Sequence, residues 1–207
     1  MDVLLGTKNR GKIVEALDLL SGLPSIDWRT HADRPFADVA ETGASFLENA
    51  LLKATAIGAE TGLPVLSEDA GLEVFALGGE PGVRSARYSG KPDSGAPVDY
   101  ARNNALLLER LSGVADRRAR FVAVAALWLP DGQVFVCSGV LGGRIALSSR
   151  GVGGFGYDPL FLPRGETRTL AEMTLDEKNA ISHRRRALGR MRGILEDLVA
   201  SGDLLGG

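Results

Sequence analysis

The chain of 207 residues is 44% hydrophobic and 24% charged, and its formal net charge is −2. This length suits one large domain or two closely joined lobes with a sizeable core. The charge argues against a non-specific nucleic-acid binder, which needs a dominant basic surface. No apolar run reaches membrane-spanning length, and no signal-peptide pattern is present. We expect a cytoplasmic protein with a single domain over residues 1–207 and no membrane or stable nucleic-acid partner.

The first predicted elements are a buried strand at residues 3–5 and a helix with apolar residues at Ile13, Leu17 and Leu20. Between them lies the segment TKNRGK, residues 7–12. A polar, glycine-containing loop between a strand and a helix offers amide groups and a positive dipole end to an anion. The spacing of a Walker loop is absent. Taken alone, the segment fits an ordinary turn better than a phosphate site.

A loop of mixed polarity around Trp28 follows, and a capping box of Ser45 and Glu48 opens a second helix. Gly62 closes that helix. Glu41 precedes it, where an acid can serve either as a dipole partner or as a metal ligand. Three apolar residues share one face of the helix: Leu47, Leu51 and Ala54.

Two adjacent acids, Glu68 and Asp69, follow a predicted strand at residues 64–66. Buried together, they would repel each other unless a cation lay beside them. The end of a strand is also where α/β proteins place catalytic groups. An ordinary acidic turn is the alternative, and we favour the functional interpretation.

Residues 77–97 are rich in Gly, Pro and Ser, and we expect a long loop or a junction between lobes. A helix is predicted over residues 98–111. Strands are expected at 120–129 and 133–140, joined by the hairpin signal Pro130-Asp131-Gly132, with a further strand near 144–146.

The stretch from residue 151 to 188 begins with a glycine loop interrupted by Phe155. Lys178, Ser182, His183 and Arg184 come later in it. A ring for stacking and donors for phosphate or carbonyl oxygens suit a nucleotide pocket. A glycine turn followed by a solvated basic helix explains this stretch equally well.

Thr174 and Glu177 form a capping box that opens the final helical region, and the rest of that region has two interpretations. On one continuous helix, His183 and Arg184 would point to different sides. We predict a break near residues 179–180, with Ser182 starting a new helix and both side chains facing one ligand. The later helix has one apolar face, made of Leu188, Met191, Leu195 and Leu198.

Seven motifs occur in order: T-x-N-x-x-K at 7–12, E-T-G at 41–43, F-x-E-N-A at 46–50, acid-Asp-x-G-L at 68–72, P-G-x-x-S-A-R-Y-S-G at 81–90, G-G-F-G-Y-D-P at 153–159 and E-K-N-A-I-S-H-R at 177–184. Together they resemble the inosine/xanthosine triphosphate pyrophosphatase family of house-cleaning nucleotide hydrolases. The resemblance implies an α/β fold with an elongated mixed central sheet, flanking helices and two lobes around a nucleotide-binding cleft. It also implies a homodimer that hydrolyses the purine nucleoside triphosphates ITP, dITP or XTP to the monophosphate and pyrophosphate with Mg²⁺.

The same resemblance assigns the site residues. The catalytic base falls on Asp69, and Mg²⁺, which takes a few carboxylate oxygens and keeps its waters, falls to Glu41, Glu68 and Asp69. The phosphate side is expected at Thr7, Lys8, Asn9, Arg10, Gly11, Lys12, Lys53 and Ala70. The base and nucleoside are expected at Phe155, Gly156, Tyr157, Asp158, Lys178, His183 and Arg184. Phe155 would stack on the purine, and donors aimed at its 6-oxygen would disfavour adenine.

One position departs from the family pattern, because Ala70 stands where a serine is usual. The missing hydroxyl removes a hydrogen bond worth about 1 kcal/mol, which could slow the enzyme or shift its preference. A related pyrophosphatase that prefers a pyrimidine or methylated nucleotide is the runner-up, although such families lack the S-H-R element. A regulatory nucleotide-binding module is the third alternative. The clustered acids speak against it.

Overall fold

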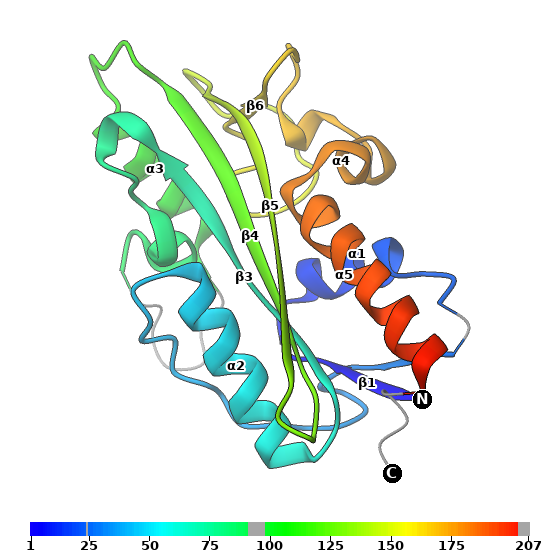
Figure 1. Cartoon of the computed structure of the whole chain (residues 1–207). Helices are drawn as coiled ribbons and strands as arrows, with labels where there is room; N and C mark the ends of the chain where they lie inside the picture. The colour runs from blue at the N-terminus through cyan, green and yellow to red at the C-terminus, as the bar shows by residue number, and fades with distance from the viewer. Residues whose placement is uncertain (24, 91–97, 203–207) are drawn as a thin grey trace. The chain divides into compact units, whose positions relative to one another are not determined.

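The computed structural model describes residues 1–23, 25–90 and 98–202 (Figure 1). The fold is α/β, as predicted: six strands form one mixed sheet in the order β2-β1-β3-β4-β5-β6, with helices on its flanks. The chain falls into two compact units. Unit 1 contains residues 1–69, 123–139 and the segment from His183 onward, and unit 2 contains residues 70–122 and 140–182. No helix in the described part of the chain is long and apolar enough to cross a membrane.

The sheet is parallel at one edge and antiparallel at the other. Strand β1 (Asp2–Leu5) pairs in parallel with β2 (Asp27–Arg29) and with the start of β3 (Val65–Val74). Strand β5 (Val134–Ile145) pairs antiparallel with β6 (Phe161–Pro163). Strand β4 (Arg118–Trp128) lies between β3 and β5 in the strand order. The three long strands β3, β4 and β5 each contribute residues to both units.

The described residues of unit 1 form three helices. Helices α1 (Arg10–Leu19) and α5 (His183–Ser201) pack against each other. Helix α2 (Phe46–Thr61) packs against the Trp128 ring of β4, and Gly58 permits this because a Cβ there would collide with the ring. The predicted apolar face of α5 is confirmed: its four leucine and methionine residues at 188, 191, 195 and 198 are buried.

Unit 2 is built around its own apolar core, which includes Leu72, Leu107, Phe121 and Phe161. Helix α3 (Tyr100–Arg110) is capped by Asp99 and agrees with the predicted helix within two residues at its start. Short 3₁₀ turns occupy Phe75–Leu77, Gly82–Arg87 and Leu170–Glu172, and α4 (Leu175–Ile181) begins at the predicted Thr174–Glu177 capping box. The residues 91–97 of the predicted long loop lie outside the described part of the chain; before them the chain forms two of these turns instead of an open loop.

Several predicted boundaries were wrong. Glu68 and Asp69 do not end a strand, because β3 continues without interruption to Val74. The strand expected near 144–146 is the end of β5, and Trp28 lies in β2, a strand that the polar surroundings concealed. The predicted break in the last helical region is confirmed: extended Ser182 separates α4 from α5 and directly precedes the new helix, two residues after the expected 179–180.

The buried faces of the first two helices agree with prediction only in part: Leu20 and Ala54 are fully buried as predicted. Helix α1 buries Glu15 and Ala16, whereas Leu17 is 36% exposed. On α2, Leu47 is 43% exposed, while Asn49 is fully buried. Polar side chains take these inward positions because each has a partner inside the fold, which sequence periodicity does not reveal.

Candidate active site

The adjacent acids of β3 are buried on opposite faces of the sheet. Glu68 is 8% and Asp69 is 6% exposed, and successive strand residues point to opposite sides. Their contacts follow this alternation: the Glu68 carboxylate pairs with a residue of α5, and the Asp69 carboxylate with residues of α2. The two acids therefore do not share one cation through their carboxylates, and each has its own set of partners.

Glu68 belongs to a buried ion-pair cluster. Arg184 donates from Nε and Nη2 to the two Glu68 oxygens at 2.6 and 2.8 Å, and from Nη1 to the Glu15 carboxylate. Lys12 Nζ lies 3.7 Å from Glu68 Oε1. Burial opposes ionisation of Glu68, but Arg184 and Lys12 outweigh it and lower its pKa to about 2. The guanidinium of Arg184 is 2% exposed, and its pKa rises despite burial because Glu68 and Glu15 stabilise its charge.

Asp69 is held by neutral and cationic donors from α2. Asn49 Nδ2 donates to Asp69 Oδ2 at 3.1 Å, and Lys53 Nζ lies 3.4 Å from Oδ1. The same ammonium donates to Glu41 Oε1 at 2.5 Å and to the backbone oxygen of Glu68 at 3.0 Å. Two carboxylate oxygens, from Glu41 and Asp69, and the backbone oxygen of Glu68 therefore converge on the Lys53 ammonium, and Mg²⁺ takes oxygen ligands of these kinds. Among the described residues, no group of three His, Cys, Asp or Glu side chains is arranged so that it could hold a metal.

Two lysines concentrate positive charge beside these acids. Lys12 Nζ donates to the Glu68 backbone oxygen at 3.2 Å, and Lys53 Nζ donates to the same oxygen. Burial lowers the pKa of Lys12, and the charges of Lys53 and Arg184 lower it further, while Glu68 and Asp69 act in the opposite direction. The two ammonium groups around one carbonyl oxygen repel each other, and the carboxylates of Glu41, Glu68 and Asp69 offset this repulsion.

The segment at residues 7–12 leads into this cationic region. Asn9 caps α1 by accepting a hydrogen bond from the Lys12 amide, and the Asn9 amide donates to Thr7 Oγ1 at 3.2 Å. Arg10, Gly11 and Lys12 form the first turn of α1. Lys8 pairs with Asp38 at 2.7 Å on the exposed side of the segment. The structure thus places the predicted phosphate residues at a helix N-terminus, which favours anions.

In unit 2, the glycine loop is organised by Asp158. Its Oδ2 accepts hydrogen bonds from the Phe155 amide at 2.9 Å and from Lys178 Nζ at 2.6 Å. Lys178 Nζ also lies 4.9 Å from the centroid of the Phe155 ring, a cation–π distance. Gly154 has φ +69°, and a Cβ there would collide with the Asp158 carboxylate. The loop therefore presents Phe155 in a position fixed by a buried ion pair.

Of the remaining predicted residues, Tyr157 and Gly156 have hydrogen-bond partners within the fold. Tyr157 is 3% exposed and donates to the Ser85 backbone oxygen at 3.0 Å, and burial raises its pKa. Gly156 accepts a hydrogen bond from Asn104 Nδ2 at 3.1 Å. His183 is buried at the first position of α5. Ala70 directly follows Asp69 within β3.

Known proteins are similar to this chain along nearly its whole length. The sequence profile described as the Ham1 family matches residues 3–194. The chain belongs to the Ham1 family. It is 49% identical over 201 residues to a protein of Symbiobacterium thermophilum named dITP/XTP pyrophosphatase, covering 97% of this chain and 98% of that protein.

Two further relatives agree. A dITP/XTP pyrophosphatase of Deinococcus deserti is 47% identical over 195 residues, which cover 94% of this chain and 89% of that protein. The solved structure of a HAM1 protein from Coxiella burnetii superposes with a TM-score of 0.85 at 39% identity, covering 95% of this chain and 99% of the other. The family membership predicted from the seven motifs is confirmed.

Sequence reasoning missed three residues that contact predicted site residues of this Ham1-family chain, two in unit 1 and one in unit 2. Glu15 shares Arg184 with Glu68, Asn49 fixes Asp69, and Asn104 fixes the glycine loop. Glu15 lies three residues after Lys12, so an acid one turn from a site lysine was the available signal. Asn49 lies inside the F-x-E-N-A motif, where its amide stood in a predicted helix interior. For Asn104 the sequence offers no local signal.

Proposed function

We propose that this protein hydrolyses non-canonical purine nucleoside triphosphates, dITP, ITP and XTP, to the nucleoside monophosphate and pyrophosphate. The observation that carries the proposal is a buried aspartate, Asp69, held by Asn49 beside the ammonium groups of Lys53 and Lys12. It occurs in a chain whose relatives at 47 and 49% identity are named dITP/XTP pyrophosphatases. A carboxylate base next to two cations suits water attack on a phosphate.

The proposed reaction starts with Asp69 accepting a proton from a water molecule. The water oxygen attacks the α-phosphorus, and the bond from that phosphorus to the oxygen bridging to the β-phosphorus breaks. The bridging oxygen leaves with pyrophosphate and takes the electron pair. Lys12 and Lys53 stabilise the negative charge that grows on the phosphate oxygens. Asn49 keeps one carboxylate oxygen of Asp69 engaged, so the other is oriented for the proton transfer.

Magnesium belongs to this proposal. Glu41 and Asp69 would hold the ion through their carboxylates and Glu68 through its backbone oxygen, because these three oxygens already converge on the Lys53 ammonium. When bound, Mg²⁺ supplies positive charge to the phosphate oxygens as a Lewis acid.

Base recognition rests on the family resemblance. Phe155 would stack on the purine, and His183 and Arg184 would donate toward its 6-oxygen. What supports the role of Phe155 is its fixed loop and the nearby Lys178 ammonium. For Arg184 the described partners are the carboxylates of Glu68 and Glu15. Its effect on base selectivity therefore includes the placement of Glu68 and is best measured as a ratio of kcat/KM for ITP and ATP.

We also propose a homodimer in which the apolar strands β4 and β5 take part. Within unit 1, Val134 and Val136 of β5 are 39 and 44% exposed, and such positions are common in subunit interfaces. Light scattering on the purified protein tests this. If the unaltered protein has the mass of one chain, and Val136→Glu does not change that mass, the homodimer is ruled out.

The test of the activity is product analysis. The purified protein is incubated with Mg²⁺ and a panel of ITP, dITP, XTP, GTP, ATP, dUTP and methylated nucleotides, and the phosphorus products are identified. We expect monophosphate and pyrophosphate from ITP, dITP and XTP, with ATP cleaved far more slowly. Orthophosphate with a diphosphate product would place attack at the γ-phosphorus and contradict the mechanism.

A further inference from the structure

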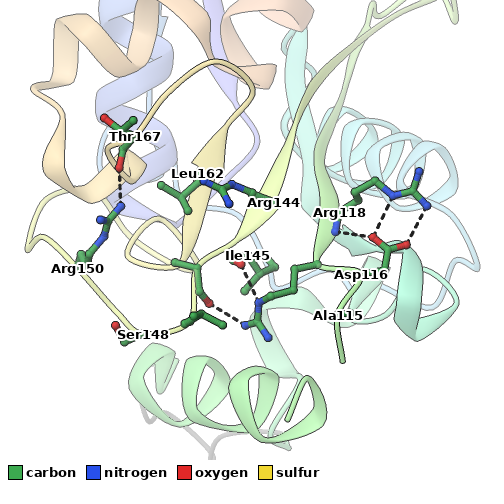
Figure 2. Close-up of a pocket in the computed structure, with 12 residues that line it drawn as sticks. Ala115, Asp116, Arg118, Arg144, Ile145, Ser148, Arg150, Leu162 and Thr167 are labelled. Carbon is green, nitrogen blue, oxygen red and sulfur yellow. Dashed lines mark hydrogen bonds and ion pairs between the residues drawn. The ribbon is translucent and has the colours of Figure 1, made fainter. Parts of the chain in front are cut away.

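Unit 2 contains a cavity that none of the seven motifs touches. Its volume is about 710 Å³, and Figure 2 shows residues from three elements around it. The walls come from the start of β4 and the residues before it, from the end of β5 and the turn after it, and from β6 and the loop that follows. The volume falls in the range of small-molecule sites, roughly 300–1,000 Å³.

The lining of this cavity carries a strong excess of positive charge. Four arginines and one acid line it: Arg117, Arg118, Arg144, Arg150 and Asp116. Four positive charges less one negative charge leave a net charge of +3 on the lining. A concave surface with one sign of charge concentrates ions of the opposite sign.

Arg117 gives the cavity a fixed positive charge. It donates to the backbone oxygens of Ile145, Leu111 and Ala146 at 2.9, 3.0 and 2.7 Å. Among the residues that the structure describes, it forms no ion pair. Burial lowers the pKa of Arg117, because the groups that surround its charge are neutral carbonyls and not carboxylates.

The other three arginines differ in whether their guanidinium groups already have hydrogen-bond or ion-pair partners. Arg118 forms a two-point pair with Asp116, at 2.9 and 2.8 Å. Arg150 donates to the Thr167 backbone oxygen at 2.7 Å and lies 3.4 Å from Glu172. Arg144 is exposed, and its side chain makes neither a hydrogen bond nor an ion pair with any described residue. Arg144 is thus the guanidinium that can bind an incoming anion with its whole fork of donors.

The cavity also has an apolar side. Ile145, Ala146 and Leu162 are buried in its lining, and Leu147 beside them is 83% exposed. A leucine this exposed next to arginines offers an organic ligand a contact that a simple ion would not use. The lining therefore suits a ligand that joins an anionic group to a flat or apolar body.

We propose that this cavity is a second binding site, separate from the Asp69 region of unit 1, for a phosphate-bearing small molecule of nucleotide size. Arg144 binds the phosphate group, and the positive charge of Arg117 adds to the attraction. The organic part of the ligand lies against Leu147 and Leu162. The site requires no catalysis, and its existence does not depend on the reaction proposed for Asp69.

Calorimetric titration at low ionic strength tests the site with two probes, pyrophosphate and inosine monophosphate. A Lys12→Ala, Lys53→Ala protein is used to weaken phosphate binding beside Asp69, so the remaining binding reports on the cavity. We expect one site per chain for each probe, with affinity that falls as salt is raised. Arg144→Ala in that background should weaken both probes at least tenfold. Leu147→Ser should weaken inosine monophosphate several-fold and leave pyrophosphate unchanged.

Arg102→Ala is the matched control, because it removes the same charge from an exposed position of α3 in the same unit. Arg102 lies nine residues before Leu111, whose backbone oxygen accepts a hydrogen bond from Arg117 of the cavity. At 1.5 Å per residue, this spacing is about 13 Å along the helix, so Arg102 is outside the cavity lining. Arg144→Ala is also made in the otherwise unaltered protein, in case the double lysine variant does not fold. If the otherwise unaltered protein binds pyrophosphate at two sites and Arg144→Ala removes one of them, the proposal is supported. A single site that Arg144→Ala leaves intact, or equal weakening by Arg102→Ala, overturns it.

Discussion

Replacing Arg184 with alanine tests the buried ion-pair cluster most directly. The substitution leaves Glu68 and Glu15, 8% and 3% exposed, without the guanidinium that joins them. Removing one partner from a buried ion pair typically costs about 3–5 kcal/mol. The pKa of Glu68 leads to a similar value: a drop from 4.5 to about 2 corresponds to roughly 3 kcal/mol at about 1.4 kcal/mol per pH unit. We expect Arg184→Ala to lose about 3–5 kcal/mol of unfolding free energy at pH 7.

The loss should depend on pH with a definite sign. In the unaltered protein the folded pKa of Glu68 lies below its ordinary value of 4.5, so its stabilisation is complete above that pH and is lost as pH falls toward 2. Without Arg184, burial is opposed only by the charges of Lys12 and His183, so the folded pKa of Glu68 should be higher than in the unaltered protein and the variant should lose less stability in acid. The stability difference between the two proteins should therefore narrow as pH is lowered from 7 to 4.

The assay is urea unfolding of both proteins at several pH values between 4 and 7. Arg185→Ala is the control, because the neighbouring side chain is exposed; it should change stability by about 0.5 kcal/mol or less. Arg184→Lys keeps a positive charge but not the two-point contact with Glu68. Its unfolding free energy should lie between that of the unaltered protein and that of Arg184→Ala. A loss below 1 kcal/mol for Arg184→Ala, or a loss that is the same at every pH, would refute the assigned role of the cluster.

Other predictions concern the reaction. Asp69→Asn should lower kcat for ITP by about 10²–10⁴-fold with the fold retained; near-normal kcat at saturating Mg²⁺ would show that another residue is the base. Asn104→Ala removes one hydrogen bond to Gly156 and should weaken nucleotide affinity by about 2–10-fold with little change in kcat; the split between KM and kcat decides this. Lys12→Ala should lower kcat/KM for ITP and ATP about equally, whereas Arg184→Ala should narrow the ratio between them. Equal losses for ITP and ATP in Arg184→Ala would place selectivity elsewhere.

Local sequence patterns predicted those parts of the fold that local forces determine. The capping residues Ser45 and Thr174 start helices where expected, because an N-cap depends on side chains within a few positions. The Pro130-Asp131-Gly132 turn joins β4 and β5 for the same reason. The seven ordered motifs then supplied the family. They did so independently of any single element boundary.

Partners distant in sequence could not be predicted in this way. Glu15 and Arg184 are 169 positions apart and Glu68 and Arg184 are 116 apart, so no periodicity links them. Helix α1 was assigned an inward face of isoleucine and leucine, and the buried position went to Glu15 because Arg184 was there to receive it. Which residues of a helix are buried therefore depends on the segments packed against it as much as on the sequence of the helix.

The two neighbouring acids of β3 show most clearly how a strand differs from the turn that was expected. In a turn, Glu68 and Asp69 could have pointed into the same space and shared one ion. In a strand the alternation separates them: Glu68 receives Arg184 on one side, and Asp69 receives Asn49 and Lys53 on the other. One acid is therefore neutralised in a buried ion pair while the next keeps an amide and an ammonium partner. The same dipeptide then supplies a structural anchor and a candidate base, and exchanging the two residues would disrupt both functions.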